Sequence, residues 1–298
     1  MHVKQEGKMS LQQYEIFDEI AKQKNFARAA EALQMSPSAV SHSIAGLESD
    51  IGFPLFFRSR TRVSLTKEGE RMLVHVREIL RQERAMREEA AMIRGLESGT
   101  VVIGTFSSVC LSWVPELIRL FKERYPGVTV KVLQGDYADV LEWVKSGEVD
   151  LGFETLPTAD KVSETPLRRD RLLCVGPADF SPANGESVTK ADMESMPFIL
   201  QREGYEADTA KFLSTRGISV SADLRVDDDR AIISFAERGL GIGLMPELAI
   251  EGAAAGISIW PVEPEETRLI GLITQAKIDL SPAAEAMRQF IEEHLREV

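Results

Sequence analysis

The sequence predicts an α/β protein in two parts, a small helical N-terminal domain followed by a larger domain of alternating strands and helices. Two short helical patterns joined by a polar turn occupy residues 25–47. A long helical pattern without proline follows at residues 66–94, and strand and helix patterns alternate beyond Gly99. A length of 298 residues suits two domains and is ample to bury a core.

The first two helical patterns form a helix-turn-helix. Ser36 is the expected N-cap of the second helix, and Pro37 at its first position loses only an N–H that would be unpaired anyway. Asn25 is the candidate cap of the first helix. Apolar residues recur at helical spacing in both helices, namely Ala29, Ala30 and Leu33, then Val40, Ile44 and Leu47.

Short polar side chains lie away from this apolar stripe. Ser38, Ser41, His42 and Gly46 give the second helix an uncharged outer face. A helix with an apolar back and such a face can enter the major groove of DNA. The pattern alone equally fits a surface helical hairpin with serine on its solvated side.

An arginine-rich segment follows and favours nucleic acid. Arg58, Arg60 and Arg62 alternate with Ser59 and Thr61, and no acid occurs between residues 51 and 66. In an extended hairpin this period places all three guanidinium groups on one side, which suits phosphates or a minor groove. A solvated charged loop is the alternative, and the basic bias inside an acidic chain argues against it.

The run from Met9 through Thr66 contains S-L-Q-Q-Y-E-I-F, F-A-R-A-A-E-A-L, S-P-S-A-V-S-H-S-I-A-G-L-E, I-G-F-P-L-F-F-R and R-V-S-L-T-K-E-G. It resembles the winged helix-turn-helix of LysR-type transcriptional regulators, and the later chain follows that family's layout. Departures are Ala27, where Ser or Thr is common, and Pro37 and His42, where Gln or Arg is often found. The residues before Met9 lie outside the pattern, so the natural start is either Met1 or Met9.

The resemblance implies three segments and a set of DNA contacts. The segments are a winged helix-turn-helix at 1–65 (helix-turn-helix at about 26–45), a linker and dimerisation helix at 66–95, and an effector-binding domain at 96–298. In that domain, lobe I is expected at about 96–158 and 262–298 and lobe II at about 159–261. The expected DNA-binding residues are Arg28, Ser36, Ser38, Ser41, His42, Arg58, Arg60 and Arg62.

The charge of the chain is unevenly distributed. A net charge of −12 would argue against nucleic acid if it were uniform. Residues 1–95 hold 15 Lys and Arg against 13 Asp and Glu, whereas residues 96–298 hold 20 against 34. The acidity therefore belongs to the second domain.

In the long helical pattern, an apolar residue recurs every seven positions, at Met72, Ile79, Met86 and Ile93, with Val76 and Ala90 at intermediate positions. This spacing is a heptad seam, interrupted by Glu83. A helix of about 29 residues spans some 40 Å, too long for a small domain to bury. We expect the same helix of a second subunit to cover the seam, and packing on the chain's own second domain is the alternative. In the family this helix is both linker and dimer contact, which implies a dimerisation set of Met72, Val76, Ile79, Met86 and Ile93.

The second domain shows a β-α-β-α-β succession that predicts a parallel sheet covered on both faces, with a polar crossing at 156–165 to a second lobe. In the family the two lobes resemble periplasmic solute-binding proteins. Expected strands are 101–106, 128–134, 149–153, 172–175, 198–200, 220–226, 239–246 and 269–274. Expected helices are 111–125, 137–146, 205–216, 228–238 and 282–296.

Ligands of open α/β sheets sit beyond the carboxyl ends of strands, which predicts an effector site of Thr105, Ser107, Ser108, Gln134, Glu154, Gln201, Asp227 and Pro246. Ser107 and Ser108 at a helix start can hold a carboxylate or another anion. Glu154 favours an ammonium or hydroxyl group, and an amphoteric, amino-acid-like ligand reconciles the two. Helix capping by the serines and a partly solvated loop acid are the alternatives.

Other function classes find little support. The only cysteines, Cys110 and Cys174, and four scattered histidines give no metal-ligand spacing, so we expect no cofactor and no metal. No phosphate loop or Ser-His-Asp set suggests an enzyme. No export signal or long apolar segment is present, so we expect a cytoplasmic protein without a membrane partner rather than a solute-binding transport protein. Cys110 is either a redox-sensing thiol or, as we prefer, a buried small residue.

These observations together predict a ligand-responsive transcriptional regulator. The partners implied by the resemblance are double-stranded promoter DNA, a small-molecule effector, further copies of the chain (a dimer, or a tetramer of two dimers) and RNA polymerase. Effector binding between the lobes is expected to change how subunits pair, and so the spacing and bending of the DNA.

Overall fold

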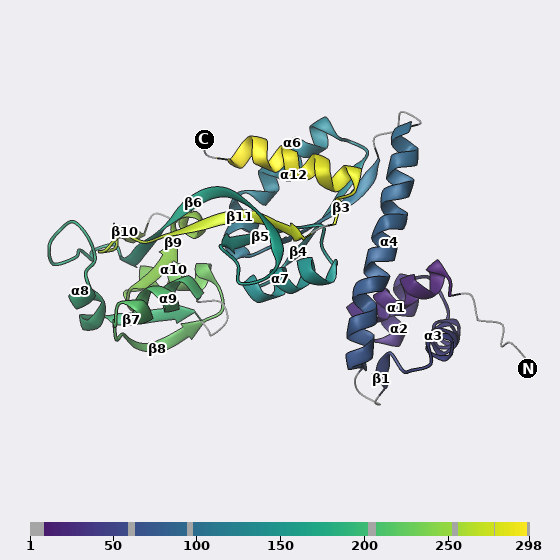
Figure 1. Ribbon diagram of the computed structural model, residues 1–298. Helices are drawn as coiled ribbons and strands as arrows, with labels where there is room; N and C mark the ends of the chain where they lie inside the picture. The colour runs from purple at the N-terminus through teal and green to yellow at the C-terminus, as the bar shows by residue number, and fades with distance from the viewer. Residues whose placement is uncertain are drawn as a thin grey trace, which may run out of the picture. The chain divides into compact units, whose positions relative to one another are not determined.

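The computed structural model describes residues 9–58, 63–93, 98–201, 207–251, 256–276 and 278–296. The chain forms two compact units (Figure 1). The N-terminal unit comprises Met1–Arg94 with Ser146–Glu148, and the C-terminal unit comprises Gly95–Lys145 with Val149–Val298. No helix of the described residues is both long enough and apolar enough to cross a membrane.

The N-terminal unit is a helical domain with a two-stranded hairpin. Its elements are α1 (Leu11–Gln23), α2 (Phe26–Ala32), α3 (Pro37–Ile51), β1 (Phe56–Arg58), β2 (Val63–Leu65) and α4 (Lys67–Ile93). Strands β1 and β2 pair antiparallel, with Phe56 opposite Leu65. Helices α2 and α3 with this hairpin form a winged helix-turn-helix.

Both predicted helix caps of the helix-turn-helix are confirmed. The side-chain oxygen of Asn25 accepts the N–H groups of Ala27 and Arg28 at 2.8 and 3.1 Å. The hydroxyl of Ser36 accepts the N–H of Ala39 at 3.2 Å, and Pro37 opens α3. Asn25 thus supplies the cap that Ala27 cannot, so α2 begins firmly.

The predicted buried stripe of α3 is also confirmed. Val40, Ile44 and Leu47 pack into one core with apolar residues of α1, α2, the hairpin and the first turns of α4. Gly69 lets α4 approach this core, because a Cβ there would lie 2.2 Å from the carbonyl oxygen of Leu55. Short local signals therefore specify this unit well.

The predicted seam of α4 divides into two parts. Met72 packs against the core of the N-terminal unit and Val76 is buried in it. Further along, Ile79, Met86 and Ile93 are 42, 67 and 79 % exposed. The exposed part of the seam therefore begins at Ile79, near the middle of the helix, because the winged domain itself covers the first turns.

The C-terminal unit is a mixed α/β structure. Its first elements are β3 (Gly99–Thr105), α5 (Ser107–Ser112), α6 (Val114–Arg124), β4 (Val128–Gln134), α7 (Tyr137–Ser146), β5 (Leu151–Leu156) and β6 (Val162–Pro177). The middle ones are α8 (Lys190–Ser195), β7 (Pro197–Gln201), α9 (Ala207–Thr215), β8 (Ser221–Val226), α10 (Asp229–Glu237), β9 (Gly243–Pro246) and α11 (Glu247–Ile250). The last are β10 (Ile257–Pro261), β11 (Thr267–Gln275) and α12 (Pro282–Leu295).

The main sheet has the strand order β10-β6-β11-β5-β3-β4, with β9 also paired to β6. Only β4, β3 and β5 are parallel to one another, whereas β11 and β6 join antiparallel. The parallel arrangement predicted for the first three strands is therefore confirmed, and β11 and β6 extend the sheet with antiparallel strands. The segment 156–165, expected as a polar crossing, leads into β6, whose first half is mostly exposed and so carries no apolar signal.

Two further boundaries differ from expectation. The helix expected at 111–125 is two helices, because Pro115 in the first turn of α6 cannot donate to the preceding turn. The apolar stretch 239–246 is a strand only from Gly243, because Gly239 and Gly241 have φ of +74° and +150°. Gly241 also lies against Pro197, where a Cβ would be 2.4 Å from its carbonyl oxygen.

The C-terminal unit has two main bodies of core, connected by β6 and β11 (Figure 1). Helices α6 and α12 pack on one face of β3 and β5 in the first core, which includes Phe121 and Phe153. The second core lies among β7, α8 and α9 and includes Phe198 and Phe212. Strand β6 contributes Leu167 to the first and Leu172 to the second, so this one strand links them.

Candidate functional site

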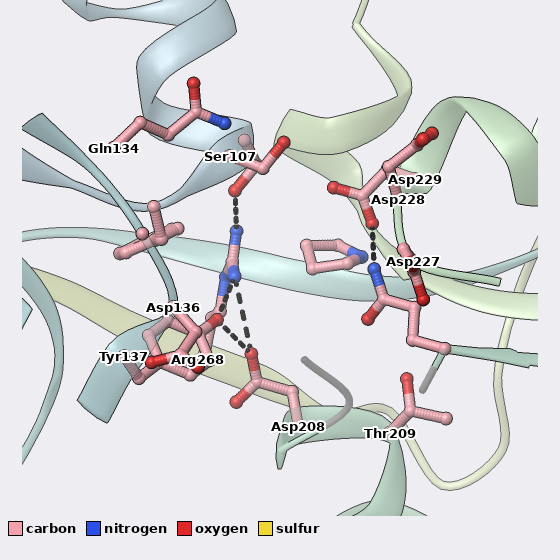
Figure 2. Close-up of a pocket in the computed structure, with 15 residues that line it drawn as sticks. Ser107, Gln134, Asp136, Tyr137, Asp208, Thr209, Asp227, Asp228, Asp229 and Arg268 are labelled. Atoms are coloured by element: carbon pink, nitrogen blue, oxygen red, sulfur yellow. Dashed lines mark hydrogen bonds and ion pairs between the residues drawn. The ribbon is translucent and has the colours of Figure 1, made fainter. Parts of the chain in front are cut away.

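A cavity of about 300 Å³ opens beyond the carboxyl ends of β3 and β4, as sheet topology predicts (Figure 2). Its wall draws on elements of both cores of the C-terminal unit. The lining residues are Phe106, Ser107, Ser108, Gln134, Gly135, Asp136, Tyr137, Gln201, Asp208, Thr209, Asp227, Asp228, Asp229, Pro246 and Arg268. We call this space the first cavity.

Six of the eight predicted effector residues line the first cavity, namely Ser107, Ser108, Gln134, Gln201, Asp227 and Pro246. The other two do not. Thr105 is fully buried in β3 and its hydroxyl donates to the carbonyl of Phe106 at 3.2 Å. Glu154 is buried in β5, opposite Gly271 of β11.

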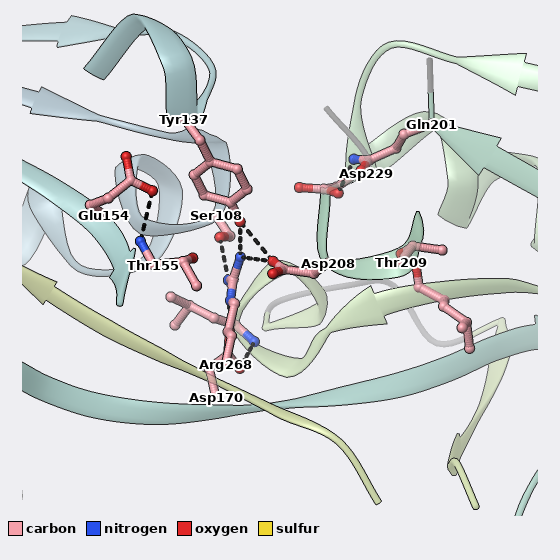
Figure 3. A network of polar contacts seen from close by, with 12 residues as sticks. Ser108, Tyr137, Glu154, Thr155, Asp170, Gln201, Asp208, Thr209, Asp229 and Arg268 are labelled. Atoms are coloured by element: carbon pink, nitrogen blue, oxygen red, sulfur yellow. Dashed lines mark hydrogen bonds and ion pairs between the residues drawn. The ribbon is translucent and has the colours of Figure 1, made fainter. Parts of the chain in front are cut away.

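Arg268 of β11 is the centre of a buried polar network (Figure 3). Its Nε and Nη2 donate to Asp170 at 2.8 and 2.6 Å, and Nη2 also donates to the hydroxyl of Ser108 at 2.8 Å. Its Nη1 donates to the hydroxyl of Tyr137 at 2.6 Å and to Asp208 at 3.3 Å. All five N–H groups of the guanidinium are therefore engaged inside the protein.

This network keeps Arg268 charged. Burial lowers the pKa of Arg268, but Tyr137, Asp170 and Asp208 outweigh burial and raise it above its usual value. Burial also raises the pKa of the Tyr137 hydroxyl, which donates to Asp208 at 2.8 Å. The guanidinium is thus a permanent structural cation with no donor left for a ligand.

The other charges of the first cavity are acidic. Asp228 caps α10 by accepting the N–H of Ala231 at 2.8 Å, and Asp136 accepts the N–H of Asp139 at 2.8 Å. Neither carboxylate has an ion-pair partner within the described part of the chain. Buried Asp229 accepts a hydrogen bond from Gln201 at 2.6 Å, and burial raises its pKa.

Glu154 is 5 % exposed and lines neither this cavity nor the one described next. One carboxylate oxygen accepts the N–H of Thr155 at 2.8 Å, and the other is buried without a hydrogen-bond partner among the described residues. Burial, followed by the charges of Asp208 and Asp136, raises the pKa of Glu154 to about 7. It is therefore a half-protonated group near neutral pH.

A second cavity of about 250 Å³ shares Asp208, Pro246 and Arg268 with the first. Its other charged residues are Arg169, Asp170, Arg171, Lys211 and Glu266. Arg169 and Lys211 form no ion pair within the described residues. This second cavity is the more basic of the two.

Sequence reasoning missed several of these residues. Asp228 and Asp229 directly follow the predicted Asp227, so the run of three aspartates after a strand was a usable signal. Arg268 lies inside a strand, and Asp208 lies in the first turn of a helix, with no motif around either. Only their place in the fold brings them together.

The predicted DNA-binding residues lie on the outside of the N-terminal unit. Arg28 on α2 and Ser36, Ser38 and His42 at α3 are exposed, and Ser41 is half-buried. The hydroxyls of Ser36 and Ser38 lie 3.1 Å apart. Arg60 and Arg62 lie outside the described residues, as does the side chain of Arg58. The outer face of α3 is thus open and uncharged.

Neither cysteine resembles a reactive thiol. Burial raises the pKa of half-buried Cys110, and burial followed by the charge of Asp192 raises that of Cys174 to about 12. Since the thiolate is the reactive form, both environments disfavour redox chemistry. No group of three or more His, Cys, Asp or Glu among the described residues is placed to hold a metal ion.

Two family models match the chain. Residues 11–70 match the bacterial regulatory helix-turn-helix protein of the lysR family, and residues 94–296 match the LysR substrate binding domain. The chain is 31 % identical over 245 residues to the uncharacterized HTH-type transcriptional regulator YvbU of Bacillus subtilis, covering 82 % of this chain and 84 % of that one. It is 29 % identical over 299 residues to the HTH-type transcriptional regulator IlvY of Escherichia coli, covering 96 and 100 %.

Solved structures of low sequence identity share the fold. A full-length OxyR variant of Pseudomonas aeruginosa is 22 % identical with a TM-score of 0.77, covering 96 % of this chain and 95 % of that one. CbnR complexed with its target DNA is 20 % identical with a TM-score of 0.65, covering 96 and 99 %. The effector-binding domain of QuiR in complex with shikimate is 20 % identical with a TM-score of 0.59, covering 66 and 97 %.

Proposed function

Because the chain belongs to the LysR family and is a DNA-binding transcriptional regulator with an effector-binding domain, we propose that occupancy of the first cavity controls how it holds promoter DNA. Helix α3 enters the major groove, and the hairpin holds the backbone. The effector lies among the residues predicted from sequence, and the regulator acts in the cytoplasm as a dimer or a tetramer of two dimers, with RNA polymerase as a further partner.

The open, uncharged outer face of α3 is the observation that carries the DNA-binding part. An apolar stripe anchors α3 in its own core, while Ser38 and His42 remain exposed. Short hydrogen-bonding side chains on an exposed helix can reach base edges, whereas arginines of the hairpin suit phosphates. DNA bound to CbnR, a protein of the same fold, is consistent with this arrangement.

The walls of the first cavity support control by a small molecule. Ser107 and Asp136 come from the region of the first core, and Gln201 and Asp228 from the region of the second. A ligand that contacts both sides stabilises one spacing of the two cores, which β6 and β11 connect. The exposed Ile79, Met86 and Ile93 of α4 offer the surface through which subunits would respond.

Electrophoretic mobility shift with the upstream DNA of the gene tests the proposal. We expect Ser38→Ala to change sequence preference, and Ser214→Ala, an exposed helical serine of the C-terminal unit, to leave it unchanged. Arg60→Ala should weaken binding to all sequences and lower the slope of log K against log salt by about 1. Equal slopes for wild type and Arg60→Ala would refute the phosphate contact, and no shift at all would refute the function.

A further inference from the structure

The first cavity has an excess of negative charge. Five aspartates line it, at positions 136, 208, 227, 228 and 229, and Arg268 is the single cation among its described lining residues. The five N–H groups of Arg268 are already taken by Asp170, Asp208, Tyr137 and Ser108. The carboxylates around a bound ligand therefore outnumber the single cation of the lining.

The carboxylates retain acceptor capacity. Asp136 and Asp228 each accept one backbone N–H, and a carboxylate has about four lone-pair sites. Both stand before the first turn of a helix, where the helix dipole attracts negative charge. They lie on opposite sides of the cavity (Figure 2).

The first cavity offers few groups that could bind an anion. The hydroxyl of Ser108 accepts from Arg268, so of the two serines expected to hold a carboxylate only Ser107 is uncommitted in the described structure. Helix α5 has only six residues and offers no substantial dipole. Of the two ligand chemistries that the sequence suggested, the ammonium group is the one that this wall suits.

This wall suits an organic cation better than a metal ion, because no group of three or more His, Cys, Asp or Glu among the described residues is placed to hold a metal. Phe106 and Tyr137 also line the cavity, with ring centroids 4.8 Å apart, and offer an aromatic surface to a carbon chain, while the guanidinium of Arg268 already lies over the Phe106 ring at 5.1 Å. A volume of about 300 Å³ is at the small end of ligand sites.

We infer that the effector of this regulator is a small organic cation, carrying at least one protonated amine or guanidinium group, which Asp136 and Asp228 bind from opposite sides of the first cavity. This inference rests on the proposed function, because it takes that cavity as the effector site. It names the charge of the effector, which neither the fold nor the family determines.

Titration calorimetry of the full-length protein with three probes of equal chain length tests the inference. The probes are 1,4-diaminobutane, 1,4-butanediol and butanedioate, which differ chiefly in charge. We expect the diamine to bind at least about tenfold more tightly than the diol, and butanedioate to bind more weakly than either. Added salt should weaken binding of the diamine.

A double variant locates the binding. Asp136→Asn with Asp228→Asn removes two charges, while the asparagine oxygens keep both helix-start hydrogen bonds. We expect this variant to lose at least about tenfold in affinity for the diamine. Asp179→Asn, which removes an exposed charge outside both cavities, should bind like the wild type. Unchanged urea unfolding of the double variant confirms that it folds.

Three results would overturn the inference: butanedioate binding more tightly than the diamine, all three probes binding alike, or no binding of the diamine at millimolar concentration. Butanedioate that binds the wild type more tightly than the diamine and alters the DNA complex would refute the charge class and leave the effector site intact. A diamine that the double variant binds as well as the wild type, without effect on DNA, would refute both.

Discussion

The two cavities of the C-terminal unit share Asp208, Pro246 and Arg268 but are opposite in charge. The first adds four aspartates to this shared wall, whereas the second adds Arg169, Arg171 and Lys211 against Asp170 and Glu266. The sign of the net charge of each cavity is therefore determined by the residues that flank the shared wall, not by the three shared residues.

The acids of the two cavities also have different partners. In the second cavity, Asp170 pairs with Arg268 and Glu266 pairs with Arg216. In the first, Asp136 and Asp228 accept backbone N–H groups at helix starts. A backbone hydrogen bond satisfies a carboxylate without neutralising it, so helix-capping acids leave a net field that ion-paired acids do not.

The largest change in stability is expected for substitution of Arg268, which lines both cavities. We expect Arg268→Met to destabilise the protein by about 3–5 kcal/mol, because it leaves buried Asp170 without its cation. Urea unfolding followed by circular dichroism measures this loss. Arg268→Lys, which keeps the charge but has fewer donors, should lose less. A loss under about 1 kcal/mol for Arg268→Met would mean that the shared wall does not depend on this pair.

The partners of Arg268 show why the sequence predicts some features and not others. The caps at Asn25 and Ser36 and the bounds of α7 follow from signals within a few residues, and the structure matches all three. Arg268 instead contacts Asp170, which is 98 residues away, and Ser108, which is 160 residues away. No local pattern encodes a contact at such separation.

The same reasoning applies to the sheet and the charges. Parallel strands β3, β4 and β5 were predictable from alternating buried runs, whereas the first half of β6 is exposed and gave no apolar signal. Six predicted effector residues line the first cavity because topology fixes where strands end. Its acidity depends on Asp136, Asp208 and Asp228, which meet only after folding.

The next largest effect on stability is expected from Glu154. This residue lines neither cavity, but the charges of Asp208 and Asp136 in the first cavity contribute to its raised pKa. Its pKa of about 7 lies above the ordinary 4.5, so the folded protein binds more protons than the unfolded chain between these values. Stability must then fall as pH rises from about 4.5 to 7 and stay reduced above it. The penalty at pH 8 is up to about 3 kcal/mol.

Glu154→Gln should remove this penalty. We expect the variant to be more stable than the wild type at pH 8, by up to about 3 kcal/mol, and little changed at pH 4.5. Urea unfolding at a series of pH values provides the measurement, with exposed Glu293→Gln as the matched control. A gain that is the same at every pH would show that titration of Glu154 is not its cause.

The smallest change in stability is expected for substitution of Arg171, at the rim of the second cavity. Arg171 and Glu247 form an ion pair at 2.7 Å, with side chains 51 and 42 % exposed. Solvent screens such a pair, so Arg171→Gln should cost no more than about 1 kcal/mol, and less in high salt. Urea unfolding in low and high salt measures both quantities. A salt-independent loss above about 2 kcal/mol would make this exposed pair equivalent to the buried pair of Arg268. The charges at the rim of the second cavity would then be as firmly fixed as those of the shared wall.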